Sequence, residues 1–302
     1  MRSVGRRAAL LGVASAGLGA LVQFIRPAHG VARIRTVGAG ARNTTTRIAK
    51  EIVDGRCGAL FQLDDLRDRT GAARLAELGH WRSLLQRTAI HPLRDVARAF
   101  VTSTTVADTS NSALVVDLNI SDPKVIEREL LRIGEPARES CADLITVTAD
   151  LDGTAYAIAQ VGPRTIAAVP EGKLDQLELF RGAAGLPESN GTAVTVFADE
   201  PGASLGALCA WPATLSNLEI DLSFSEYGAT IDLISTSTSA AQANLDAQAL
   251  GATVNGLLEV DLLLFEVQVL GPIRCIASGD KVAMFATLGK TELDLLLALG
   301  SM

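Results

Sequence analysis

Aromatic residues are scarce in this chain of 302 residues, where Phe, Trp and Tyr together make up 4%. Sugar sites and surfaces that stack nucleic-acid bases depend on exposed aromatic rings, so the composition disfavours both. The core must be built from aliphatic side chains, since 48% of the residues are hydrophobic and 20% are charged. These proportions are typical of a packed globular protein rather than a disordered one.

Acidic residues are missing from the first 50 positions. That stretch holds nine of the 27 basic residues and none of the 34 acidic ones. The rest of the chain is therefore strongly acidic, and an acidic body repels phosphate backbones and anionic membrane surfaces. We expect no nucleic-acid partner, and contact with a membrane only through the apolar stretch at residues 8–25.

The basic, apolar and small residues near the start follow one another in the order of an export signal. Residues 8–25 are uncharged and mostly apolar, and Ala28 and Gly30 occupy the third and first positions before a cut after Gly30. This order predicts that residues 1–30 are a signal, and hence that the protein is periplasmic or secreted.

The route of export is open between two alternatives. The adjacent pair Arg6 and Arg7 is typical of a twin-arginine signal, which exports folded proteins, but a general secretory signal can also carry two arginines. A third hypothesis is that residues 8–25 stay uncleaved and anchor the protein in the inner membrane, because their length as a helix approaches the thickness of a bilayer core.

Cysteine is also infrequent, with four residues in the chain: Cys57, Cys141, Cys209 and Cys275. An even number in an oxidising compartment allows disulfides in three pairings, and buried free thiols are the alternative. No two of the four have the spacing of metal ligands, so we expect neither a metal nor another cofactor.

Turn signals between alternating apolar and polar residues indicate hairpins. The pairs Asp152-Gly153 and Gly279-Asp280 each separate two strand-like runs, and such pairs favour antiparallel hairpins. Residues 123–134 predict a helix that Asp122 caps and Gly134 ends. Residues 31–55 lack strong periodicity, and we interpret them as a basic tether or an irregular segment.

An offset of 117 residues aligns the turn signals of two parts of the chain. Gly162 falls on Gly279 and Gly172-Lys173 falls on Gly289-Lys290, each before a Leu-rich segment. The sequence therefore predicts an α+β fold of two related halves, residues 56–187 and 188–302. Each half is expected to have antiparallel strands and hairpins with helices packed on one face.

One short motif suggests an enzyme. The run from Asp150 to Thr154, "DLDGT", resembles the first motif of the haloacid-dehalogenase-like phosphatases. The resemblance implies that Asp150 attacks phosphorus, that Asp152 acts as general acid and base, and that Mg²⁺ offsets their charge. It also implies a later metal motif, for which Ser278–Lys281 is the candidate.

A hairpin explains the same residues. The strand before Asp150 alternates, with Thr146 and Thr148, whereas a buried parallel strand needs a continuous apolar run. Glycine at position 153 supplies the positive φ of a hairpin turn. We favour the hairpin interpretation over catalysis.

Other candidate chemistry is sparse. His80 is expected at the end of a helix, His91-Pro92 at the start of a turn, and Asp64–Asp68 at a solvated strand end. No nucleophile elbow, phosphate loop or dinucleotide motif occurs in the sequence. The apolar segment 256–271 is interpreted as the end of a helix and a buried strand, or alternatively as the wall of a groove for an apolar ligand.

These observations favour an exported protein without enzymatic activity, which acts by binding an unidentified partner or as a structural component of the cell envelope. The first alternative is a Mg²⁺-dependent phosphatase that uses Asp150 and Asp152. The second is a carrier that holds a small apolar ligand along residues 257–270.

Overall fold

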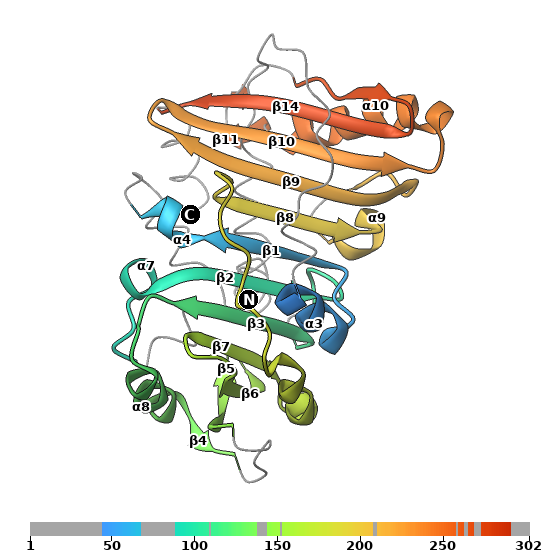
Figure 1. Ribbon diagram of the computed structural model, residues 1–302. Coiled ribbons are helices and arrows are strands. Elements are labelled where there is room, and N and C mark those ends of the chain that lie inside the picture. The colour runs from blue at the N-terminus through green and yellow to red at the C-terminus, as the bar shows by residue number, and fades with distance from the viewer. Residues whose placement is uncertain are drawn as a thin grey trace.

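A twelve-stranded sheet runs through the whole computed structural model (Figure 1). Every pairing between its described strands is antiparallel. The structure describes residues 44–67, 88–108, 110–137, 144–151, 153–207, 210–257, 259–262, 265–268 and 273–290. The fold is therefore α+β, as the sequence predicts.

The described residues of the first half, together with α3 just before it, supply seven strands to the large sheet and five helical segments. In chain order they are α3 (Thr44–Val53), β1 (Cys57–Gln62), α4 (Leu63–Leu66), α7 (Pro92–Asp95), β2 (Val96–Ser103), β3 (Ser112–Leu118), α8 (Pro123–Ile133), β4 (Glu135–Pro136), β5 (Thr146–Leu151), β6 (Thr154–Gln160), β7 (Thr165–Pro170) and the 3₁₀ helix η2 (Glu171–Phe180).

The second half continues the sheet and adds a separate two-stranded ribbon. Its elements are β8 (Val194–Asp199), α9 (Pro201–Ser204), β9 (Leu215–Ser225), β10 (Gly228–Ser237), α10 (Ala240–Leu257), β11 (Glu259–Leu262), β12 (Phe265–Gln268), β13 (Ile276–Ser278) and β14 (Lys281–Gly289). Strands β11 and β12 pair only with each other among the described strands.

The two halves share one strand order. Their first strands, β1 and β8, pair at the middle of the sheet, and the order outward is β2, β3, β7, β6 on one side and β9, β10, β14, β13 on the other. A helix follows the third strand in both cases, α8 in the first half and α10 in the second. The halves are thus related in topology and form one continuous sheet.

One face of the sheet is apolar from end to end. Alternate residues of the strands in both halves point into a single core, which α8 and α10 also enter with side chains such as Ile126 and Leu250. The period of two residues in the strands places these side chains on the same face.

The opposite face is apolar only in the first half, and there it has helices of its own. Ile52 of α3 and Phe180 of η2 pack with Phe100 and Leu60 of the sheet. On this face, Leu60 of β1 has Phe100 of β2 on one side and the polar Thr195 of β8 on the other. The second core therefore ends near β8. The expectation of helices on one face is wrong for the first half, because its strands are apolar on both sides and both sides need cover.

The expected tether at residues 31–55 is wrong for its second part. Residues 44–53 form α3, and the helix buries Ile48, Ala49, Ile52 and Val53 against the sheet. These positions recur at the spacing of an amphipathic helix. The pattern is hard to recognise in the sequence because three threonines come before it. Residues 31–43 lie outside the described residues.

The predicted hairpins and the capped helix are confirmed. Leu151 pairs with Thr154 across a two-residue turn in which Gly153 has φ +86°, and Gly279, at φ +60°, turns β13 into β14. The Asp122 side chain accepts a hydrogen bond from the Lys124 amide, 3.0 Å away, at the start of α8.

Two smaller expectations need correction. The acidic stretch at residues 64–68 was expected to end a strand, but residues 63–66 form α4, because Leu63 and Leu66 are both buried while Asp64 and Asp65 face solvent. The segment 256–271 does contain the end of a helix, and the backbone beyond it forms the β11–β12 hairpin rather than one strand.

No helix within the described ranges has both the length and the apolarity to cross a membrane. The proposed signal at residues 1–30, including the run 8–25, lies outside the described residues.

A buried carboxylate fixes α10 to the sheet. Asp246 is 2% exposed and accepts hydrogen bonds from Ser237, from Thr214 Oγ1 at 2.5 Å and from Gln242 Nε2 at 2.8 Å. Burial alone would raise the pKa of Asp246, but these three hydrogen bonds outweigh it and lower the pKa below its usual value. The ionised form therefore stabilises the fold.

We predict that Asp246→Asn lowers the free energy of unfolding by about 2 kcal/mol at pH 7, because one oxygen acceptor becomes a donor inside a set of donors. The lowered pKa stabilises the fold above the carboxyl's unfolded value near pH 4, and this stabilisation is lost as the pH falls through the folded value. Denaturant unfolding should show that the free energy of unfolding of Asp246→Asn differs less from that of wild type at pH 3 than at pH 7. Asp280→Asn, at an exposed position, is the control. A stability difference that is the same at both pH values would show that ionised Asp246 does not stabilise the fold.

Candidate functional site

The segment that joins the two halves crosses the sheet and is held to it by several hydrogen bonds. We call residues 181–193 the linker; it runs from η2 over the strands of the first half to β8 (Figure 1). Leu186 of the linker is buried in the second core, and Gln62 Nε2 donates to the Pro187 carbonyl oxygen at 3.0 Å. The linker is thus packed onto the sheet.

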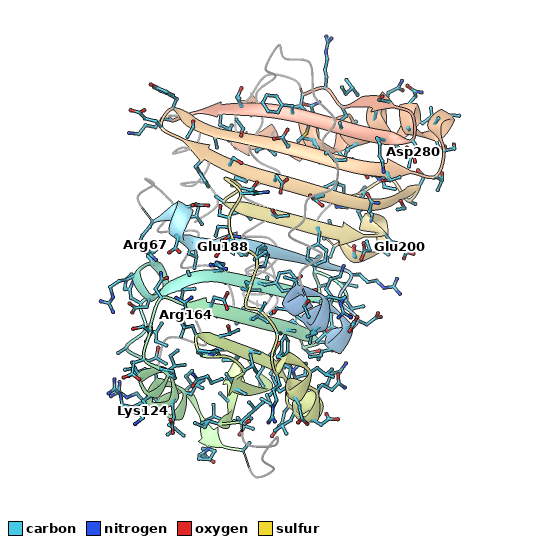
Figure 2. The ribbon with its side chains drawn as sticks, in the orientation of Figure 1. Arg67, Lys124, Arg164, Glu188, Glu200 and Asp280 are labelled. Carbon is cyan, nitrogen blue, oxygen red and sulfur yellow. The ribbon has the colours of Figure 1, made fainter. Side chains whose placement is uncertain are left out.

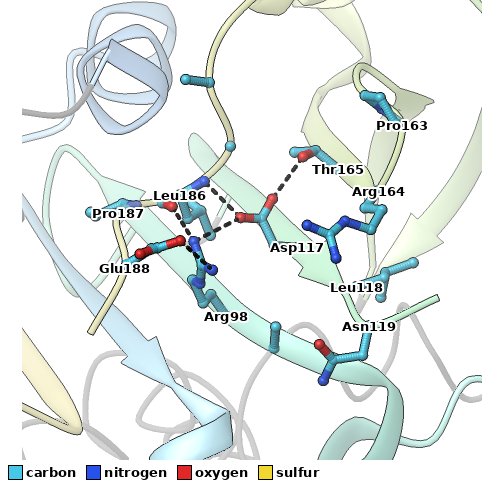
Figure 3. Close-up of a pocket in the computed structure, with 13 residues that line it drawn as sticks. Arg98, Asp117, Leu118, Asn119, Pro163, Arg164, Thr165, Leu186, Pro187 and Glu188 are labelled. Carbon is cyan, nitrogen blue, oxygen red and sulfur yellow. Dashed lines mark hydrogen bonds and ion pairs between the residues drawn. The ribbon is translucent and has the colours of Figure 1, made fainter. Parts of the chain in front are cut away.

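A cavity of about 460 Å³ lies between the linker and the adjacent strand ends. We call it the linker pocket (Figure 3). Its walls are Ala97 and Arg98 of β2, Asp117 and Leu118 of β3 with the following Asn119, residues 163–165 at the β6–β7 turn, and residues 184–188 of the linker. The volume falls within the range of about 300–1,000 Å³ in which small-molecule sites are found.

Asp117 holds three parts of the chain together beneath this pocket. Its Oδ1 accepts a hydrogen bond from Thr165 Oγ1 and its Oδ2 accepts one from the Leu186 amide, each at 2.7 Å. A Cβ atom at Gly185 would lie 3.0 Å from Oδ2, so the close approach of the linker needs glycine there. Because both carboxylate oxygens accept hydrogen bonds from other parts of the chain, Asp117 anchors the linker and β7 to β3.

Arg98 completes the attachment of the linker. Its Nη1 donates to the Leu186 carbonyl oxygen at 2.5 Å and lies 3.8 Å from Asp117 Oδ2. Its Nη2 is 4.0 Å from Glu188 Oε1, but the Glu188 side chain is 90% exposed, so water screens that pair. The charge of Arg98 is therefore balanced chiefly by Asp117.

Arg164 differs from Arg98 because its side chain makes no hydrogen bond or ion pair with the described parts of the chain. Its backbone is fixed, since the Arg164 carbonyl oxygen accepts from the Leu118 amide at 2.8 Å. Figure 3 shows its guanidinium turned inward, toward the space between Asp117 and Asn119. The pocket wall therefore carries an exposed guanidinium whose backbone is fixed and whose N–H donors have no partner among the described residues.

A second cavity of about 500 Å³ lies beside α9, at the other end of the sheet. Small side chains and backbone make up most of its walls, and its one charged residue, Glu200, pairs with Arg56 at 3.0 Å. It offers few charged or amide side chains that could orient a ligand, whereas the linker pocket is lined by several.

Asp150 lies in the hairpin that the alternating pattern predicts. Its exposed side chain accepts a hydrogen bond from the Gly153 amide at 2.7 Å and closes the turn; Asp152 lies outside the described residues. Asp280 occupies the turn of the β13–β14 hairpin in the other half. The phosphatase resemblance implies a parallel sheet, which the described strands do not form.

Cys57 and Cys275 are free thiols in the structure. Burial raises the pKa of Cys57 to about 11 and that of Cys275 to about 12, so both stay protonated at neutral pH. Cys57 and Cys275 are thus not bonded to each other, and Cys141 and Cys209 lie outside the described residues.

His91 begins a turn, as predicted, because its carbonyl oxygen accepts from the amides of Arg94 and Asp95 at the start of α7. His80 and the signal residues Arg6, Arg7, Ala28 and Gly30 lie outside the described residues. Within the described ranges, no group of three or more His, Cys, Asp or Glu side chains is placed to hold a metal ion.

None of the charged residues of the linker pocket was predicted from the sequence as a site residue. One signal was Asp117, which interrupts the apolar run "ALVVDL", every residue of which is buried in β3. A carboxylate in such a run requires hydrogen-bond donors from elsewhere in the fold. A second signal was Arg98, which interrupts the apolar run "VARAFV" of β2 in the same way. Arg164 carried no comparable signal, because it lies at a turn, where arginines are common on surfaces.

We predict that Asp117→Asn loosens the linker, since the loss of charge leaves Arg98 without its chief partner and replaces one acceptor by a donor. The free energy of unfolding should fall by about 3 kcal/mol, and limited proteolysis should cut within residues 183–190 at lower protease concentrations than in wild type. Asp280→Asn, in an exposed turn, is the control. Equal resistance of all three proteins would show that Asp117 does not hold the linker.

Comparison with known proteins gives no family. No family model matches the chain, and no curated protein matches it either. Three crystal forms of TP0453 are similar to it at 10–12% sequence identity: form I with a TM-score of 0.49, covering 84% of this chain and 98% of that one; form III with 0.43, covering 82% and 95%; and form IV with 0.42, covering 82% and 93%. A likeness at these values supports no inference about function.

Proposed function

We propose that this protein is exported and acts without catalysis, as a binding protein that holds a small polar ligand in the linker pocket. The observation that carries the proposal is the arrangement of Arg98, Asp117 and Arg164. Two of these groups satisfy each other and fix the walls, while the third faces the cavity without a described partner. Walls that are fixed before binding reduce the entropy lost on association.

The chemistry of the walls supports binding rather than turnover. Both oxygens of Asp117 accept hydrogen bonds from other parts of the chain, and the side chain is buried, which suits a residue that holds the walls in place. Arginine stays protonated at physiological pH, so Arg98 and Arg164 serve as hydrogen-bond donors rather than as proton shuttles.

The polar lining also favours a polar ligand over an apolar one. An apolar ligand would leave Arg164 and Asn119 without water and without partners, which costs free energy. The hypothesis of an apolar-ligand carrier concerns residues 257–270, whose side chains lie outside the described residues.

Export is tested on the precursor. We predict that the mature protein begins at Val31, because the signal would be cut after Gly30. N-terminal sequencing of the fractionated protein measures this directly. The double substitution Arg6→Lys with Arg7→Lys should hold the precursor in the cytoplasm if the route is the twin-arginine one. A cytoplasmic product that keeps Met1 would contradict export by either route.

Binding in the linker pocket is tested by filling it. Ala184 lines the pocket and is exposed, so Ala184→Trp adds bulk there without disturbing the core. We predict that at least one compound in a panel of sugars, amino acids, organic acids and phosphate esters raises the melting temperature of wild type but not that of Ala184→Trp.

Ala241→Trp is the matched control, because Ala241 is exposed on α10, away from the pocket. It should respond to the compound as wild type does. The proposal fails if no compound stabilises wild type at millimolar concentration, or if Ala184→Trp is stabilised equally.

A further inference from the structure

Four charged side chains line the linker pocket: Asp117 is buried, Arg98 is partly buried, and Arg164 and Glu188 are exposed. Two guanidiniums, Arg98 and Arg164, line it together with one buried carboxylate, Asp117. Asp117 balances Arg98 at 3.8 Å, and Glu188 is too exposed to balance Arg164 through water. The exposed guanidinium of Arg164 is therefore left without a close counter-charge among the described residues.

We infer that Arg164 is the anchor for an anionic group, a carboxylate or a phosphate, on the ligand of the linker pocket. The inference rests on the proposed function and names the class of ligand. A guanidinium offers a planar pair of N–H donors that matches both anions in a bidentate geometry. A neutral or cationic ligand would leave this pair of donors unmatched.

The backbone of Arg164 is positioned in advance of any ligand. The residue lies at a tight turn, where the Gly162 amide donates to the Thr165 carbonyl oxygen at 3.3 Å. The next side chain, Thr165, is held by Asp117, and the Arg164 carbonyl oxygen is held by β3. The Arg164 side chain thus extends from a fixed backbone, next to Asp117, which also holds the linker.

Asn119 adds a second recognition element on the same wall. Its Nδ2 donates to Asp64 Oδ1 at 3.0 Å, which orients the amide and leaves Oδ1 as an acceptor. Figure 3 shows Asn119 below Arg164. The ligand that fits this pair has an anionic group with a hydrogen-bond donor close to it, such as a hydroxy acid or the phosphate ester of a polyol.

The test is calorimetric titration of the full mature chain at constant ionic strength. The probes are inorganic phosphate, glycerol phosphate, lactate and succinate, with glycerol and lactamide as neutral counterparts. Arg164→Gln removes the charge and keeps most of the side-chain length. Lys124→Gln removes one positive charge from α8, outside the lining of the pocket (Figure 2), and is the matched control.

We expect at least one anionic probe to bind wild type and Lys124→Gln equally, and Arg164→Gln about ten to a hundred times more weakly, the loss that one charge-assisted hydrogen-bonded pair produces. Comparing the affinities of the phosphate probes and the carboxylate probes shows which of the two anionic groups the pocket binds. The melting temperature of Arg164→Gln without ligand should stay close to that of wild type, since the side chain has no partner within the described structure.

Three results would overturn the inference: equal affinity of wild type and Arg164→Gln, equal binding of the neutral counterparts, or no binding of any anionic probe at 10 mM, roughly the weak limit of a specific site. None of these results alone contradicts the proposed function. A neutral compound that stabilises wild type but not Ala184→Trp would still show that the linker pocket binds a ligand, although not an anionic one.

Discussion

The carboxylate of Asp117 is the point at which separate parts of this protein are joined. It lies on β3, accepts a hydrogen bond from Thr165 at the start of β7 and another from the Leu186 amide of the linker, and faces the guanidinium of Arg98 on β2. A buried carboxylate is costly unless such donors surround it. The same set of contacts therefore holds the linker to the sheet and shapes the pocket beneath it.

The position of this anchor follows from the way the two halves share a sheet. Strands β1 and β8 pair at the centre, while the chain leaves the first half at η2, several strands away from β8. The linker must cross the sheet to reach β8, and it does so over the face that is apolar only in the first half. Its polar backbone needs partners there, and Asp117, Arg98 and Gln62 supply them.

Local patterns predicted the hairpins and the capped helix but not the site. The hairpin at Gly153 and the cap at Asp122 depend on neighbours in the chain, so sequence alone predicts them. The class of fold follows from these, and so do the related halves. The helix α3 and the helices on the second face were missed because they depend on which strands are apolar on both sides. Arg98, Asp117, Arg164 and Leu186 meet only through tertiary structure, and no spacing in the sequence brings them together.

The central claim is that the linker pocket, rather than the acidic hairpin at Asp150, is the working site of a non-catalytic binding protein. A two-dimensional NMR titration of the isotope-labelled mature protein measures this most directly, with whichever compound stabilises it best. The claim predicts that the largest shift changes fall on residues 97–98, 117–119, 163–165 and 184–188, and that the compound is recovered unaltered. Shift changes centred on residues 150–154, or conversion of the compound into a product, would contradict it.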